Sequence, residues 1–457
     1  MGLFTDSLER EYEHKIEVNP RLLRKHVSNQ ANKKAPFYNW FNFKEGFSKY
    51  LVEMFIRDYP KKNCRILDPF SGSGTTLFTA QEMNLEAVGI EIMPIGGFIL
   101  KSRESALRVN VSLLIDTIKK LKEMTFLEKD INENTKFRHL TITKGAFPKK
   151  TEKKLNVFLE IIEKEISNKN IKQLLRFACF CILEDISYTR KDGQYLRWDS
   201  RSARSKSKFK KKKIYSFEGA IFNQLDKMIN DISNQKLFLN NLKEKPKIKL
   251  ISGSNLEEMP KLESESFDLI ITSPPYCNRY DYTRTYALEL AFLGLDDIRI
   301  KELRQKLLSC TVENKDKNDF LKRIYNKEYF RLIEDSFFSD SCINEIISHF
   351  KRLREMKKLN NPNIYRMIKN YIYEHSFVIF EMFRLLKKGG RIYYVNDNVR
   401  YSGKTVPIDL ILSEIAKKAG FKIKGIFKLQ KGKGNSSQQM SSYGRTEVRK
   451  CVYYWEK

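Results

Sequence analysis

The order of elements around one glycine-rich turn limits the fold of this chain more than any other feature. Cys64-Arg65-Ile66-Leu67 is typical of a buried strand, and Asp68-Pro69-Phe70-Ser71-Gly72-Ser73-Gly74-Thr75-Thr76 follows it and opens a helical pattern. A second apolar segment, Ala87-Val88-Gly89-Ile90, ends in Glu91. Glycines between a strand and a helix let backbone N–H groups approach a ligand, and an acid after the next strand can bind ribose hydroxyls. This order predicts an α/β nucleotide-binding fold. A phosphate-binding P-loop is not expected, because it would need a lysine after the second glycine.

A second motif lies far downstream, after another apolar segment. Phe267-Asp268-Leu269-Ile270-Ile271 predicts a buried parallel strand, and Thr272-Ser273-Pro274-Pro275-Tyr276 stands at its carboxyl end. Open α/β sheets place their ligand sites there. The two prolines have no N–H, so the backbone carbonyls remain as rigid acceptors beside a hydroxyl and an aromatic ring. These groups predict a pocket that holds an exocyclic amine by two hydrogen bonds while its ring is stacked.

The two motifs together resemble the DNA amino-methyltransferases, which transfer a methyl group from S-adenosylmethionine to cytosine N4 or adenine N6. Two flanking segments are similar to that family as well: 39–48 resembles the part beside the cofactor's methionine end, and 386–395 the later helix–glycine–strand unit. The resemblance covers roughly residues 36–100, 247–296 and 377–457. It implies an α/β fold with a Rossmann-like seven-stranded methyltransferase sheet and two largely helical insertions.

The resemblance also implies the site residues. Catalysis is expected to depend on Ser273, Pro274, Pro275 and Tyr276. Where the family often has Gly-Asp to bind the cofactor's adenine, Gly253 is followed here by Ser254 and Asn255, so the adenine contact stays open. The expected cofactor-binding residues are Trp40, Asp68, Phe70, Ser71, Gly72, Ser73, Gly74, Thr75, Thr76, Glu91 and Ser254.

The predicted mechanism depends on alignment and needs no strong base. An amine inside a duplex is stacked and conjugated, so the nucleotide has to be flipped out, at a cost of a few kcal/mol. Ser273 Oγ and the Pro274 carbonyl would hold the amine hydrogens while the sulfonium methyl lies in line for displacement. We interpret Cys277 as a packing residue, because covalent cysteine chemistry belongs to methylation at ring carbon.

The motif favours cytosine N4 as the target, because Ser-Pro-Pro-Tyr is the form associated with it in this family. Adenine N6 is the first alternative, since Asp or Asn at the first position is commoner there. Methylation of an RNA amine and a catalytically silent DNA-binding protein on the same scaffold are further alternatives.

The charge of the chain favours double-stranded DNA as a partner. The formal net charge is +29 and the isoelectric point about 9.6, although a generally lysine-rich composition is an alternative explanation. Basic residues concentrate in one segment with interleaved aromatics, which predicts phosphate contacts and stacking; a solvated loop is the alternative. The expected DNA-binding residues are Arg190, Lys191, Arg197, Arg201, Arg204, Lys210, Lys211, Lys212 and Lys213, with Arg279 beyond the catalytic motif.

Other classes of site are not expected. The seven cysteines form no Cys-x-x-Cys pair and the five histidines are scattered, so we expect neither a disulfide framework nor a metal. The chain has no apolar run long enough to span a membrane. We therefore expect a cytoplasmic protein. The family resemblance further implies that it is nucleoid-associated and belongs to a restriction-modification or phage-defence system, with a possible cognate restriction enzyme.

The domain organisation follows from where the family motifs are interrupted. Residues 1–100 are expected to form an N-terminal segment and the cofactor-binding half, 247–296 the catalytic strand, and 377–457 the C-terminal part of the catalytic domain. The segments 101–246 and 297–376 read as helical, charged insertions. Either of them is a candidate for target recognition.

Overall fold

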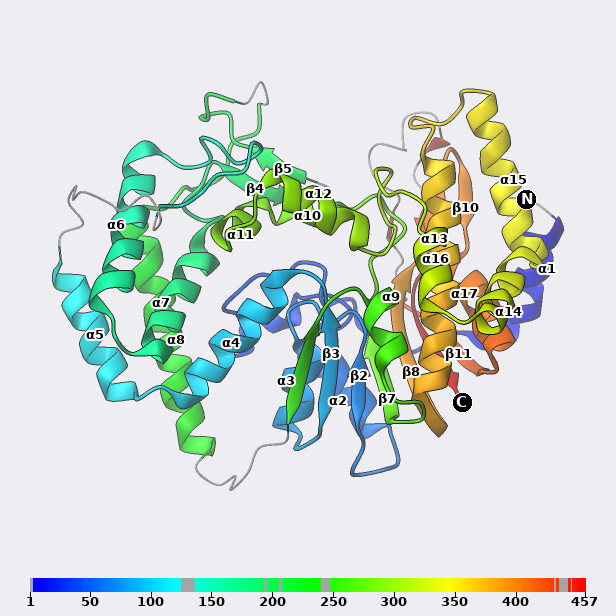
Figure 1. The fold of residues 1–457 in the computed structure, drawn as a ribbon, viewed down its shortest axis with the longest axis horizontal. Coiled ribbons are helices and arrows are strands. Elements are labelled where there is room, and N and C mark those ends of the chain that lie inside the picture. The colour runs from blue at the N-terminus through cyan, green and yellow to red at the C-terminus, as the bar shows by residue number, and fades with distance from the viewer. Residues whose placement is uncertain are drawn as a thin grey trace.

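One twisted sheet with helices on both faces organises the chain in this computed structural model (Figure 1). The structure describes residues 3–124, 136–192, 195–204, 208–239, 247–430, 433–434, 443–444 and 446–457. The strand order is β1-β11-β14-β8-β7-β2-β3-β6. These strands are β1 (Ile16–Val18), β2 (Ile66–Asp68), β3 (Ala87–Glu91), β6 (Ile248–Ser252), β7 (Phe267–Thr272), β8 (Leu386–Asp397), β11 (Lys422–Lys428) and β14 (Lys450–Glu456).

The sheet confirms the predicted α/β methyltransferase arrangement and adds one strand to it. β14 is antiparallel to β11 and β8, and the other neighbouring pairs are parallel. The sheet has eight strands where seven were expected, and the additional one is β1, which pairs with β11 and forms one edge of the sheet. Three residues, Ile-Glu-Val, are too short to show a periodicity, and only the partner strand makes them a strand.

Alternate residues of the central strands face two different cores. Ile66 and Leu269 pack with α2 (Lys49–Arg57) and α3 (Thr75–Glu82). Leu67 and Ile270 pack on the opposite side, with α16 (Ile364–Leu385) and α17 (Ile408–Ala419). Because both faces are covered, the strands are apolar throughout, which is why they can be recognised in the sequence.

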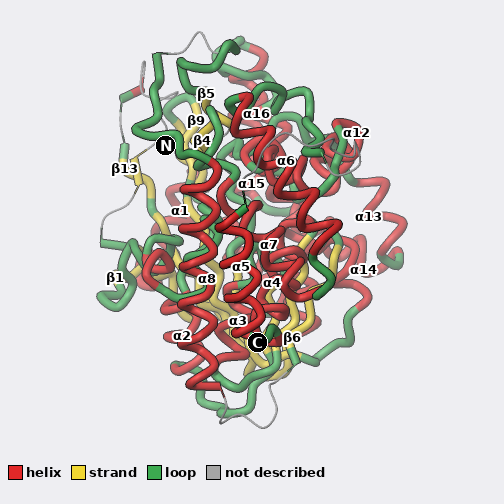
Figure 2. Tube along the Cα trace, turned by 90° about the vertical axis from the view of Figure 1, so that its left-hand side faces the viewer, coloured by secondary structure: helices red, strands yellow, loops and turns green. Residues whose placement is uncertain are grey.

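The first insertion forms a lobe with its own core at one end of the sheet, at the left in Figure 1. Figure 2, viewed from this side, shows its helices in front of the strands. A β-hairpin within it was not predicted, because its strands are four residues each and rich in charge. The lobe contains α4 (Pro94–Arg108), α5 (Val111–Glu123), α6 (Lys149–Glu165), α7 (Lys169–Ile182), β4 (Thr189–Asp192), β5 (Tyr195–Trp198) and α8 (Phe217–Leu239).

The second insertion packs at the other end of the sheet, against α16 and α17. At that end lie α13 (Asn318–Ile324), α14 (Lys327–Phe338) and α15 (Ser341–Glu355), and α1 (Leu3–Tyr12) packs beside α15. The exception is the first helix of this insertion, α12 (Asp297–Lys306), which packs into the core of the first lobe. Short elements connect these parts: α9 (Asn255–Glu258), α10 (Tyr282–Thr285), α11 (Ala287–Phe292), β9 (Val399–Tyr401), β10 (Lys404–Val406), β12 (Lys433–Gly434) and β13 (Glu447–Val448). None of the described helices has the length and apolar character needed to cross a membrane.

Candidate active site

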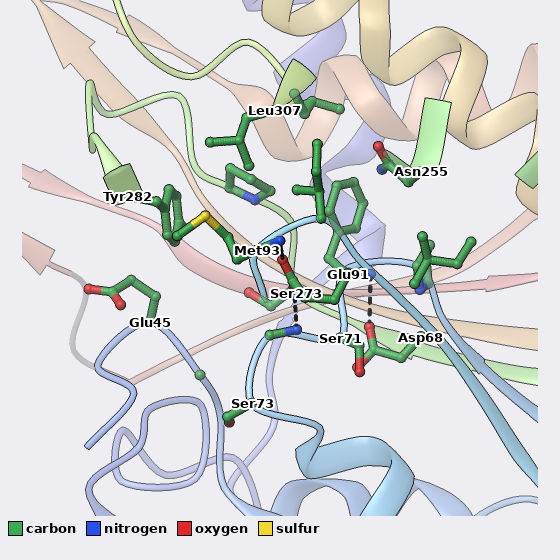
Figure 3. A pocket seen from close by; sticks show the side chains of 18 of the residues that line it. Glu45, Asp68, Ser71, Ser73, Glu91, Met93, Asn255, Ser273, Tyr282 and Leu307 are labelled. Atoms are coloured by element: carbon green, nitrogen blue, oxygen red, sulfur yellow. Dashed lines mark hydrogen bonds between the residues drawn. The ribbon is translucent and has the colours of Figure 1, made fainter. Parts of the chain in front are cut away.

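A cavity of about 750 Å³ lies at the carboxyl ends of β2, β3, β6 and β7, and we call it the first cavity (Figure 3). Ligand sites of open α/β sheets are found at this edge. The structure brings residues of both sequence motifs together here, although the motifs are far apart in the chain. The predicted residues that line it are Asp68, Phe70, Ser71, Gly72, Ser73, Thr75, Glu91, Ser254, Ser273 and Pro275.

The glycine turn lines the first cavity, and its backbone has a conformation that favours glycine. Gly72 has φ +53° and Gly74 φ +79°, both in the left-handed region. The Gly72 N–H donates to Glu91 Oε2 at 2.6 Å, and the Met93 N–H donates to Glu91 Oε1 at 2.7 Å. The turn and the acid after β3 are therefore fixed to each other, as the strand–turn–helix–strand–acid order predicts.

Burial raises the pKa of three carboxyl groups that line the first cavity, those of Glu45, Asp68 and Glu91. Burial raises the pKa of Asp68 to about 6, although Asp68 accepts hydrogen bonds from the Thr272 hydroxyl at 2.6 Å and the Phe70 N–H at 3.1 Å. Burial likewise raises the pKa of Glu91 to about 7, against the opposing effect of its two backbone N–H donors. Groups with such shifts in a cavity mark a functional site.

Gly96 supports the turn and was not among the predicted site residues. A Cβ on Gly96 would lie 2.6 Å from the Gly72 carbonyl oxygen and 2.8 Å from Glu91 Cγ, so α4 approaches the turn closely only because this position has no side chain. The signal in the sequence is the Gly96-Gly97 pair near the start of a helix, where glycine is disfavoured unless packing requires it.

Gly96→Ala is therefore expected to weaken cofactor binding, because the added methyl group has to displace the backbone of the turn or Glu91. Gly97→Ala is the matched control, since nothing lies within 4 Å of its Cβ position and alanine is better than glycine in a helix. Calorimetric titration with the cofactor checks this prediction. Equal affinities for the two variants would show that the close approach of α4 to the turn does not matter.

At the other end of the first cavity, the free polar group belongs to Asn255 instead of Ser254. The Ser254 hydroxyl donates to the Lys306 carbonyl at 3.0 Å, which leaves it without a proton to donate into the cavity. Asn255 Oδ1 accepts from the Leu256 N–H at 2.9 Å, which fixes the orientation of the amide. Its Nδ2 is buried without a hydrogen-bond partner in the described part of the chain. A buried donor of this kind is satisfied by a ligand or by an ordered water.

Three expected cofactor-binding residues, Trp40, Gly74 and Thr76, do not line the first cavity. The Trp40 indole N–H donates to Asp231 Oδ2 on α8 at 2.8 Å, so this ring fastens the N-terminal segment to the first lobe. The Thr76 hydroxyl is fully buried and donates to the Ile271 carbonyl. The segment that contains Trp40 still contributes to the cavity, but through Phe43, Glu45, Gly46 and Phe47.

A second cavity of about 950 Å³ adjoins the first. Pro274 and Tyr276 line it, and Glu45, Gly46 and Tyr282 line both cavities. The Ser-Pro-Pro-Tyr motif therefore divides between the two, with Ser273 and Pro275 facing the first and Pro274 and Tyr276 facing the second. Basic side chains in the second cavity come from separate segments: Arg24, Lys44 and Lys450.

Ser273 lies at the boundary as a hydrogen-bond acceptor. Its Oγ is 3.1 Å from the Val395 carbonyl and 3.3 Å from the Tyr276 hydroxyl, to either of which it donates its proton. Its lone pairs remain available to accept from a ligand. The neighbouring Cys277 is fully buried, and burial raises the pKa of its thiol far above the ordinary value, as befits a packing residue.

The expected DNA-binding residues fall into three groups. Lys191 is only 4% exposed and pairs with Glu289 and Glu184. Lys211 is partly buried, and its Nζ donates to the carbonyls of Glu184, Ser187 and Thr189, so the ammonium groups of both lysines are engaged within the protein. The arginines are engaged by neighbours, and Arg279 lines neither cavity. Arg197 pairs with Asp192, Arg201 with Asp199, Arg204 donates to two carbonyls, and Arg190 lies near the Phe209 ring.

Lys210, Lys212 and Lys213 are the lysines of the predicted run that remain exposed. The hydrogen bonds of Lys191 and Lys211 lie across elements far apart in sequence, so no local pattern distinguishes these two from their neighbours. Lys206, which belongs to the same basic segment, lies outside the described residues.

Comparison with known proteins agrees with this geometry. A family model described as DNA methylase matches residues 9–95, a range that contains the glycine turn and Glu91. Type II methyltransferase M.AvaI of Nostoc sp. (strain PCC 7120 / SAG 25.82 / UTEX 2576) is 47% identical over 465 residues, which cover 99% of this chain and 93% of that protein. Type II methyltransferase M.BsoBI of Geobacillus stearothermophilus is 40% identical over 471 residues, 98% of this chain and 91% of that protein. The chain therefore belongs to the DNA methylase family, and its predicted membership of the S-adenosylmethionine-dependent DNA amino-methyltransferases is confirmed.

Proposed function

We propose that this protein methylates cytosine N4 at a specific sequence of double-stranded DNA, as the modification enzyme of a restriction-modification system. The observation that carries this proposal is the meeting of two cavities at one Ser-Pro-Pro-Tyr motif. A methyl donor in the first cavity and a flipped base in the second would meet there. The curated relatives are named type II methyltransferases, which supports a partner endonuclease that cuts the same sequence.

The first cavity suits S-adenosylmethionine, which when bound supplies an electrophilic methyl group. Glu91 would accept hydrogen bonds from the ribose hydroxyls, and Asn255 Nδ2 is a free donor for an acceptor of the adenine ring. Asp68 would lie toward the cationic, amino-acid end. The glycine turn lets the backbone approach the ligand closely.

The second cavity would hold the flipped base against Tyr276. The lone pairs of Ser273 and the Pro274 carbonyl would accept hydrogen bonds from the two N–H groups of the amine. With both N–H groups held, the lone pair of the nitrogen would point toward the methyl group. This chain's contribution to the rate would then be alignment and exclusion of water. The Ser-Pro-Pro-Tyr form of the motif supports cytosine N4 over adenine N6.

The direct test is to incubate DNA with the protein and labelled S-adenosylmethionine, digest it and identify the nucleoside by mass. N4-methylcytosine is the expected product. N6-methyladenine would overturn the choice of base, while 5-methylcytosine, or label in RNA alone, would overturn the proposed reaction. Label in no nucleic acid, with the cofactor bound, would favour the catalytically silent alternative.

Cofactor affinity is expected to rise with pH between about 6 and 8. The Glu91 carboxyl, with its pKa of about 7, is largely protonated at the lower end of this range and then accepts hydrogen bonds poorly. Binding that favours the carboxylate must release protons near pH 6.5 and release none well above pH 8. Calorimetry in buffers of different ionisation enthalpy measures this release. A Glu91→Gln variant should lose the pH dependence, and a wild-type affinity that is flat from pH 6 to 8 would contradict the role of Glu91.

The exposed lysines of the basic segment are expected to act through counterion release. Changing Lys210, Lys212 and Lys213 to Gln, with the partly buried Lys211 retained, should lower the slope of log affinity against log salt by about 0.9 per lost phosphate contact. Cognate and random duplexes should weaken alike. The control is Lys119→Gln with Lys120→Gln on α5, at the outer edge of the first lobe (Figure 1). Equal slopes for the wild type and the triple variant would identify these lysines as a solvated loop.

A further inference from the structure

The second cavity is lined by one member of a shielded ion pair, Lys450, which the proposed chemistry does not use. Lys450 on β14 lies opposite Asp397 at the end of β8 in the sheet ladder. Lys450 Nζ is 3.3 Å from Asp397 Oδ1, and the two side chains are only 15% and 5% exposed. Removing two charges from water costs several kcal/mol per ion before their attraction is counted. Because such a pair is costly to bury, its position beside a ligand cavity makes it a candidate for recognising the ligand.

The ammonium group of Lys450 has one donor left for a ligand. Nζ pairs with Asp397 and lies 5.2 Å from the centroid of the Tyr276 ring, and these two neighbours can engage at most two of its three N–H groups. The third has no acceptor among the described residues, and Lys450 lines the second cavity beside Tyr276. Lys44, the other lysine of this cavity, already donates to the Lys191 carbonyl.

Asp397 keeps this donor charged and in place. Burial alone would lower the pKa of Lys450, but the neighbouring Tyr276 and Asp397 outweigh it and hold the pKa above its ordinary value. Neither Asp397 oxygen has a hydrogen-bond partner among the described residues, so the ion pair with Lys450 is the contact that neutralises this carboxylate. The pair therefore presents a fixed cationic donor to whatever stacks on Tyr276.

We propose that Lys450 donates a hydrogen bond to the O2 carbonyl of the flipped cytosine and thereby selects a pyrimidine. This inference rests on the proposed function, because it concerns the base held by the same cavity. Cytosine presents a strong carbonyl acceptor next to N3, on the side of the ring away from the bond-forming amine. Adenine presents a C–H group between its two ring nitrogens, which offers no acceptor there. Lys450 is thus a specificity-determining residue, with Asp397 as its positioning partner.

The test is a cycle that combines a Lys450 variant with deletion of the base oxygen. Once the methylated position is mapped, its cytosine is replaced in a synthetic duplex by a 2-aminopyridine C-nucleoside. This analogue keeps the amine and the adjacent ring nitrogen but lacks O2. Lys450→Met should lower kcat/KM for the cytosine duplex about 10- to 100-fold, the range for a lost hydrogen bond to a charged group. On the analogue duplex, the wild type and Lys450→Met should be nearly equal.

Because the analogue's different reactivity cancels within the cycle, only the coupling between lysine and oxygen remains. If Lys450→Met lowers kcat/KM by the same factor on the analogue duplex as on the cytosine duplex, the two effects are independent. That result would overturn the assignment even though cytosine is methylated. A wild type that makes no N4-methylcytosine at all would instead overturn the proposed function. Lys424→Met, at an exposed position of the neighbouring β11, is the matched control.

Cofactor affinity, measured on every variant, separates misfolding from lost recognition. If Lys450→Met does not fold, Lys450→Gln provides the same cycle with a neutral donor and should show a smaller coupling of the same sign. No coupling in a folded Lys450→Gln that has lost activity would also contradict the proposal.

Discussion

Lys191→Met is expected to lower the free energy of unfolding by about 3–5 kcal/mol, the usual result of removing one partner from a buried ion pair. Lys191 is 4% exposed and Glu289 is 1% exposed. The substitution leaves Glu289 charged among apolar side chains, or forces it to take up a proton. It also removes the cation that lies 4.8 Å from the Phe41 ring and 5.0 Å from the Tyr286 ring. The hairpin of the first lobe thereby loses its ion pair with α11.

Denaturant unfolding monitored by circular dichroism measures this loss. Lys212→Met is the control, because Lys212 is exposed in the same basic segment and its substitution should change stability by less than about 0.5 kcal/mol. The double variant Lys191→Met, Glu289→Leu should recover much of the lost stability, because no unpaired charge remains. A Lys191→Met protein as stable as the control would mean that the ion pair is not buried in solution.

Tyr276→Ala is expected to lower kcat/KM for DNA roughly 5- to 150-fold. This corresponds to a loss of about 1–3 kcal/mol in transition-state stabilisation, the range for one lost stacking contact with a base. Tyr276 lines the second cavity, where the flipped base would lie, and does not line the first. Methyl transfer from labelled cofactor to duplex DNA measures the effect. Tyr276→Phe keeps the ring and loses the hydroxyl that bonds Ser273, so it separates stacking from orientation of the serine. Wild-type activity in Tyr276→Ala would contradict stacking of a flipped base on this residue.

The fold could be predicted from the sequence to the extent that apolar patterns are local. β2, β3, β7 and the second half of β8 (392–397) are buried on both faces, so each contains an apolar run, and the glycine turn and Glu91 lie at the ends of such runs. β1 was not predicted, because it is defined by its pairing with β11, which is a tertiary contact. The polar residues that follow these apolar runs therefore indicate the edge of the sheet at which both cavities lie.

Charge, in contrast, could not be interpreted from the sequence alone. Lys211 belongs to the same lysine run as Lys210 and Lys212, and Lys191 to the same basic segment, yet protein carboxylates and carbonyls from other segments engage the ammonium groups of Lys191 and Lys211. Trp40 was expected beside the cofactor and instead bonds to Asp231, nearly two hundred residues away in the chain. Asn255 and Lys450 became candidates only when the structure showed which of their donors lack acceptors.

The central claim is that the two cavities divide the reaction, with cofactor in the first and the target base in the second. Calorimetric titration of S-adenosylmethionine into the Glu91→Ala and Tyr276→Ala variants, with wild type alongside, tests it most directly. Glu91→Ala should bind the cofactor more weakly by about 1–3 kcal/mol, since it removes a charged hydrogen-bond acceptor. Tyr276→Ala should bind it with wild-type affinity while methyl transfer to DNA is impaired. Unchanged affinity in Glu91→Ala, or an equal loss of affinity in Tyr276→Ala, would contradict this division.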